Sequence, residues 1–218
     1  DSAFEACRNL AKVNLLRPGT ADESEGGAGG EAEPTISGSL SSIGYYAFSY
    51  CVALGELILP NTYSESDIRV STFEGCTSLK HIYATGETTR VNFVDNDNYY
   101  SFKDFRQGVD STFYFECPKG SALENTAITN YFVFKYSDEE IYEKKIPDES
   151  STLSADGFYA LNAIFEVTRI DEGNTGKVTN VIIDSGLKNL SIPGQVGPLA
   201  VAEIAEGGFR NNTVLTNV

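Results

Sequence analysis

Four cysteines and one histidine are the residues of this 218-residue chain that could ligate a metal or supply a nucleophile and a base. Structural zinc sites use close pairs such as Cys-x-x-Cys, and the chain contains no such pair. His81 is the sole histidine, and no Gly-x-Ser-x-Gly motif accompanies it to form a Ser-His-Asp triad. We therefore predict no catalytic residues, no metal site, no cofactor and no enzymatic activity.

Two adjoining clusters leave other chemistry open. Residues 95–98, Asp-Asn-Asp-Asn, offer oxygen ligands for calcium, but Tyr99 and Tyr100 stand where an EF-hand loop needs an oxygen ligand and a glycine. The segment is a polar loop or a looser oxygen site. Residues 99–105 are rich in aromatic side chains, which could stack on a sugar or form a local core, and we favour the core.

The charge of the chain narrows the classes of partner. Sixteen Lys and Arg against 31 Asp and Glu leave a net charge of −15. Nucleic-acid binding requires a basic surface, so we expect no nucleic-acid partner. No run approaches the roughly 20 apolar residues that span a bilayer, so we predict no membrane span. Five of the acids lie with four glycines in residues 21–34, which indicates an acidic insertion.

The elements that position these residues repeat along the chain. A Phe is followed three residues later by a Cys, three further on by a Leu, and then by a short apolar strand. The spacing by three suits a 3-10 turn, and a short strand buries its apolar edge only against a copy of itself. The copies begin at Phe4, Phe48, Phe73 and Phe209, the last with Asn212 in place of Cys.

These motifs resemble the BspA-like leucine-rich repeat, a Cys-containing class of surface proteins. Residues 43–60, which run from Ile43 through Phe48 and Cys51 to Leu59-Pro60, carry the clearest match. Residues 113–122 resemble the segment that closes a block of such repeats. The resemblance implies a leucine-rich-repeat solenoid, α/β in class and rich in β-structure, with stacked short parallel strands on a concave face and helical or 3-10 turns on a convex face.

Three parts follow from this comparison. Residues 1–136 form a leucine-rich-repeat block, with the acidic insertion at 21–34 and a closing segment at 113–136. Residues 137–152 are polar and form a linker, and residues 153–218 start a second repeat block. Within the closing segment, Ser121 precedes Glu124 by the capping-box spacing, which predicts a short helix over 121–128.

The outward positions of the repeat strands are the candidate ligand-binding residues. In leucine-rich repeats they line the concave sheet, the extended surface used for binding, and the alternative is a merely solvated face. The candidates are Lys12, Asn14, Glu56, Ile58, His81, Tyr83 and Asn217.

The function implied by the resemblance is recognition. We expect a non-enzymatic, extracellular or cell-surface bacterial adhesion module that binds host or microbial surface proteins through the concave face. One alternative is a structural subunit that stacks head to tail through open repeat ends into a filament. Another is a carbohydrate-binding accessory domain of a larger surface protein, with glycans as ligands.

Overall fold

The computed structural model describes residues 2–15, 43–59, 68–84, 93–94, 101–147, 162–210, 212–213 and 215–218. The acidic insertion at 21–34 and the candidate oxygen ligands at 95–98 lie outside the described residues.

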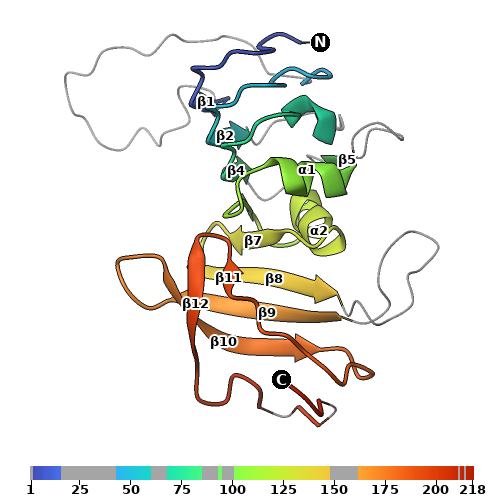
Figure 1. Ribbon diagram of the computed structural model, residues 1–218, viewed down its shortest axis with the longest axis vertical. Coiled ribbons are helices and arrows are strands. Elements are labelled where there is room, and N and C mark those ends of the chain that lie inside the picture. The colour runs from blue at the N-terminus through green and yellow to red at the C-terminus, as the bar shows by residue number, and fades with distance from the viewer. Residues whose placement is uncertain are drawn as a thin grey trace.

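A ten-stranded sheet runs the length of the molecule in the order β1-β2-β4-β6-β7-β8-β9-β10-β12-β11 (Figure 1). Its strands are β1 Lys12–Asn14, β2 Glu56–Leu59, β4 His81–Ala84, β6 Tyr114–Cys117, β7 Val133–Tyr136, β8 Ile141–Pro147, β9 Asn162–Arg169, β10 Thr175–Ile183, β11 Gln195–Val196 and β12 Leu199–Ile204. Strands β1 to β7 pair in parallel, β7 to β10 are antiparallel, and β10 pairs in parallel with β12. A separate pair joins β3 Ile68–Arg69 to β5 Phe93–Val94.

The repeat motif forms the turn that precedes each of the first three parallel strands. The rings of Phe4, Phe48 and Phe73 stack in a row, with centroids 5.4 and 6.0 Å apart. The thiol of Cys51 donates to the carbonyl oxygen of Phe4, and that of Cys76 to the carbonyl oxygen of Phe48, each at 3.0 Å. Successive motifs thus contact one another directly, and the chain has a β-rich repeat fold.

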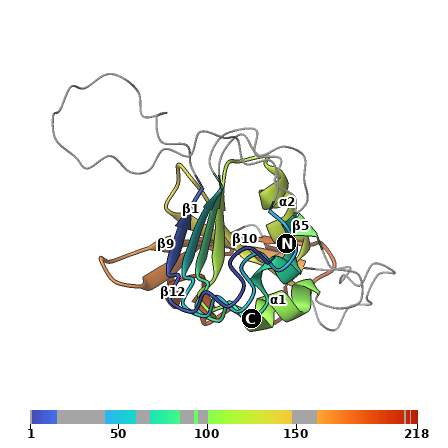
Figure 2. The ribbon, with the colours of Figure 1, turned by 90° about the horizontal axis from the view of Figure 1, so that it is seen from above.

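In the part of the chain that the structure describes, three short helical elements lie beside the parallel strands. They are the 3-10 turn η1 Val70–Phe73, α1 Phe102–Gly108 and α2 Ala122–Thr129. Both α-helices lie on the same side of the parallel strands (Figure 2). The predicted helix over 121–128 is confirmed: the Ser121 hydroxyl caps α2 by accepting from the backbone N–H of Glu124 at 3.2 Å.

Residues 137–152 differ from the predicted linker over the part that the structure describes. Strand β8 occupies Ile141–Pro147 and pairs with β7 on one side and β9 on the other. The sequence 141–147 alternates too weakly for a strand to stand out. Its place is fixed by hydrogen bonds to partners on either side.

Two hydrophobic cores lie on opposite faces of this sheet. The first packs the inner side chains of β2, β4, β6 and β7 against the Phe turns, α1 and α2. The second packs β8, β9 and β10 against the C-terminal segment around Leu187, Leu190 and Leu199. The change of face occurs at β7, where Phe134 belongs to the first core and Val133 to the second.

Candidate functional site

The register of the parallel strands aligns the outward side chains into two rows. One row runs from Lys12 through Glu56 and His81 to Tyr114, and the other from Asn14 through Ile58 and Tyr83 to Glu116. Because side chains alternate along a strand, all of these positions share the face opposite the first core. We call them the open strand face: Lys12, Asn14, Glu56, Ile58, His81, Tyr83, Tyr114 and Glu116.

Six of the seven sequence-predicted site residues lie on this face. Asn217 lies elsewhere: it forms an isolated bridge with Asn189, and its amide donates to the Asn189 side-chain oxygen at 2.7 Å. The structure therefore does not bring Asn217 into the two rows. Its motif has the right spacing, but it follows β12, on the far side of the ten-stranded sheet from β1.

Aromatic side chains form the centre of the open strand face. The His81 ring stacks on the Tyr114 ring with centroids 4.6 Å apart. The ring of Tyr83, two residues along the same strand, lies 6.1 Å from the His81 ring between centroids. Ile58, next to Tyr83 in register, is nearly buried at 8% exposed. Toward the β1 edge, the ammonium of Lys12 lies 3.0 Å from the carboxylate of Glu56.

The other side of the face is a charged network. Glu116 Oε2 lies 3.2 Å from His81 Nε2, and Glu116 Oε1 lies 3.4 Å from Lys135 Nζ. Lys135 also lies 3.5 Å from Glu140. Burial raises the pKa of Glu116, but the His81 imidazole and the Lys135 ammonium together lower it by more. The pKa of Glu116 therefore lies below its ordinary value. Glu116 consequently stays ionised beside His81 and Lys135.

Tyr114, Glu116 and Lys135 are members of this site that the repeat motif did not indicate. No Phe-x-x-Cys-x-x-Leu motif precedes β6 or β7, so these strands could not be aligned with the earlier ones by motif. The usable signal was the alternation in residues 113–117, where Phe115 and Cys117 are buried and Tyr114 and Glu116 are partly exposed. Such alternation marks a strand with one buried face.

The hairpin of β11 and β12 ends the open strand face at β7. A Cβ at Gly197, in its turn, would lie 3.2 Å from atoms of both Tyr142 and Val133 and 3.7 Å from Tyr114. Lys135 and Val133, which continue the two rows, are consequently only 7% and 6% exposed. The accessible surface thus spans β1 to β6.

The cysteines are arranged for packing. Cys51, Cys76 and Cys117 are fully buried, and Cys7 is exposed. Burial raises the pKa of the Cys76 and Cys117 thiols to about 12, which keeps them protonated.

Among the described residues, no group of three or more His, Cys, Asp or Glu side chains is placed to hold a metal ion.

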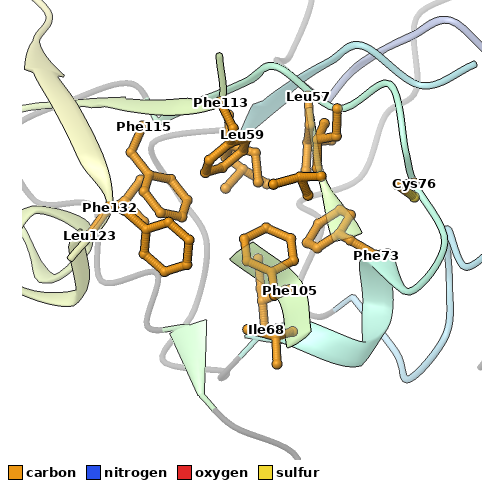
Figure 3. Close-up of a cluster of buried hydrophobic side chains, with 14 of the residues drawn as sticks. Leu57, Leu59, Ile68, Phe73, Cys76, Phe105, Phe113, Phe115, Leu123 and Phe132 are labelled. Carbon is orange, nitrogen blue, oxygen red and sulfur yellow. The ribbon is translucent and has the colours of Figure 1, made fainter. Parts of the chain in front are cut away.

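Phe105, from the aromatic segment at 99–105, is part of the first core. It is fully buried, and its ring meets Phe113 edge to face at 5.4 Å (Figure 3). Tyr99 and Tyr100 lie outside the described residues. Among the helices that the structure describes, none is long and apolar enough to cross a membrane.

Comparison with known proteins identifies the repeat. Residues 32–107, about a third of the chain, match the family described as BspA type leucine rich repeat region (6 copies). No curated protein and no solved structure matches the chain. The chain therefore carries a BspA-type leucine-rich-repeat region, and the resemblance inferred from the Phe–Cys–Leu motif is confirmed.

Proposed function

We propose that this chain is a non-enzymatic recognition module that binds a partner protein through the open strand face. In this proposal, β1 to β7 form the concave wall of a solenoid and the Phe turns and short helices its convex side. The module acts outside the cell or on its surface, where it recognises host or microbial surface proteins. The observation that carries the proposal is the register that places the two rows side by side across four parallel strands.

The composition of the face supports binding to a protein. Protein interfaces combine a central aromatic or apolar cluster with a polar rim, and Tyr is among the residues enriched in their energetic centres. Here His81, Tyr83 and Tyr114 form the centre. The Lys12–Glu56 pair lies on one side, and Glu116, held ionised beside the buried Lys135, lies on the other. Repeat proteins use surfaces of this extended kind for recognition.

Binding of the whole chain to a panel of purified host and bacterial surface proteins, measured by biolayer interferometry, tests the proposal. For a partner found in this way, His81→Ala with Tyr83→Ala removes two central side chains and should weaken binding at least about tenfold. Because His81 also contacts Tyr114 and Glu116, the circular dichroism spectrum and melting temperature of the double variant are measured to show that it remains folded at the assay temperature. Glu172→Ala with Lys188→Ala, at exposed positions away from the face, is the matched control.

Equal affinity of the wild type and the His81–Tyr83 double variant for every partner found would refute this use of the face. Equal weakening by the control pair would show that binding depends on a general property of the chain instead.

A further inference from the structure

A second sheet face lies beyond the first core. Strands β8, β9 and β10 continue the sheet, and the second core covers one of their faces. On the other face, the register aligns Lys145 with Ile164 and Ile164 with Ile182. It also aligns Glu143 with Glu166 and Glu166 with Asn180. We call these residues, together with Ile141, the Ile-Glu face.

The Ile-Glu face carries apolar side chains that the fold leaves accessible. Ile182 is 53% exposed, and its cross-strand neighbour Ile164 is partly exposed. Helix α2 packs on β6 and β7, which lie before this part of the sheet. The pair lies near the end of the β9–β10 ladder. Accessible apolar side chains grouped on one face are a feature of interaction surfaces.

The two carboxylates beside the isoleucines repel each other and so destabilise the folded chain. Glu143 and Glu166 stand directly opposite each other on neighbouring strands, and like charges in this position are destabilising. Glu124 and Glu139 add to the negative field around Glu143. Glu166 accepts a hydrogen bond from the Asn180 amide at 3.2 Å, a neutral donor.

The cations on or near this face contact groups other than its two carboxylates. Lys145 lies over the ring of Tyr131, Lys119 over the ring of Tyr136, and Lys177 pairs with Glu203 at 3.2 Å. No cation in the part of the chain that the structure describes forms an ion pair with Glu143 or Glu166. Lys119 lowers the pKa of Glu143 only weakly, by less than burial and the neighbouring carboxylates raise it. The face thus combines accessible apolar area with two facing carboxylates that form no ion pair in the described part of the chain.

We propose that the Ile-Glu face docks a basic amphipathic segment of a partner protein, with apolar side chains on Ile164 and Ile182 and a Lys or Arg between Glu143 and Glu166. Charge complementarity selects this occupant, because a cation there replaces the Glu143–Glu166 repulsion with two attractions. A second copy of this chain is a poor fit, since it carries the same net charge of −15. This surface is separate from the open strand face, and the proposal does not depend on the function proposed for that face.

A fluorescein-labelled amphipathic helical peptide of leucine and lysine, about 18 residues long, is the probe. Its anisotropy with the full chain, near pH 8 and about 0.15 M salt, gives the dissociation constant. Glu143→Gln with Glu166→Gln should weaken binding about tenfold or more. Glu5→Gln with Glu172→Gln removes the same charge at exposed positions away from this face and should change it less than about twofold.

A second pair tests the apolar contact. Ile182→Thr should weaken peptide binding several-fold, while Ile170→Thr, at an exposed hairpin position, should not. His81→Ala with Tyr83→Ala should leave peptide binding unchanged. Equal weakening by both glutamate pairs would mean attraction to net charge alone and would overturn the proposal. Sedimentation as a dimer that Ile182→Thr dissociates would overturn it in favour of a second copy.

Discussion

Val133 and Phe134 are consecutive residues of β7, yet their side chains lie in different hydrophobic cores on opposite faces of the sheet. Phe134 is fully buried in the core of the repeat motifs, and Val133, at 6% exposed, packs with Tyr142 and the C-terminal strands. Alternation of side chains along a strand makes this arrangement possible. One strand therefore belongs to both halves of the molecule.

This shared strand predicts that the two halves unfold together. Phe134→Ala should lower the free energy of unfolding by about 3–5 kcal/mol, and Val133→Ala by about 2 kcal/mol, because each leaves a cavity in its core. Hydrogen exchange followed by mass spectrometry should show faster exchange in both the α2 and the β9–β10 regions for either variant.

Ile182→Ala, at an exposed position of β10, is the control and should change neither region by much. Phe134→Ala that accelerates exchange only on the α2 side would contradict the shared-strand interpretation.

The sequence could reveal what depends on local spacing. The Phe–Cys–Leu motif predicted the repeat, and the Ser121–Glu124 pair predicted the capped start of α2. The change of core at β7 and the position of β8 depend on pairing between segments distant in sequence, which no local period encodes. Tyr114 and Glu116 joined the site for the same reason, since only the β4–β6 register brings them beside His81 and Tyr83.

The repulsion on the Ile-Glu face predicts a stability that falls as pH rises. Burial, followed by the charges of Glu166, Glu124 and Glu139, raises the pKa of Glu143 from 4.5 to about 7. The Glu143 carboxyl therefore loses its proton at a lower pH in the unfolded chain than in the folded one. The contribution of this proton to the free energy of unfolding is fully present below pH 4.5 and is lost as pH rises through 7.

Glu143→Gln should remove this loss. Urea denaturation should show the variant more stable than the wild type by about 1 kcal/mol near pH 8, the upper range for a cross-strand pair, and equal to it near pH 4. Glu172→Gln, at an exposed turn, should leave the pH profile unchanged. A Glu143→Gln profile parallel to that of the wild type would show that another group controls the pH dependence.

The burial of the thiols predicts selective labelling. At pH 8 a thiol with a pKa of about 12 is ionised in about one molecule in ten thousand, so Cys76 and Cys117 should react very slowly in the folded protein. Cys7 is exposed and should react first with a thiol reagent such as a dithiobisbenzoate.

Absorbance should therefore report one fast thiol in the native state and all four after unfolding in urea. Cys7→Ser should abolish the fast phase. Rapid labelling of Cys76 in that variant, seen by peptide mapping, would mean that the repeat turns open readily.

Substitution of Gly197 tests how tightly the β11–β12 hairpin packs against the sheet at the end of the open strand face. Gly197 and Gly120 both have positive φ, +55° and +78°, so alanine at either costs about 1–2 kcal/mol of backbone strain. A Cβ at Gly120 meets nothing within 4 Å, whereas one at Gly197 lies 3.2 Å from Tyr142 and Val133. Urea denaturation should therefore show Gly197→Ala less stable than Gly120→Ala by about a further 1–2 kcal/mol, the usual cost of overpacking. Equal losses in the two variants would show that the hairpin yields to the added methyl group, and that its contact with the sheet is loose.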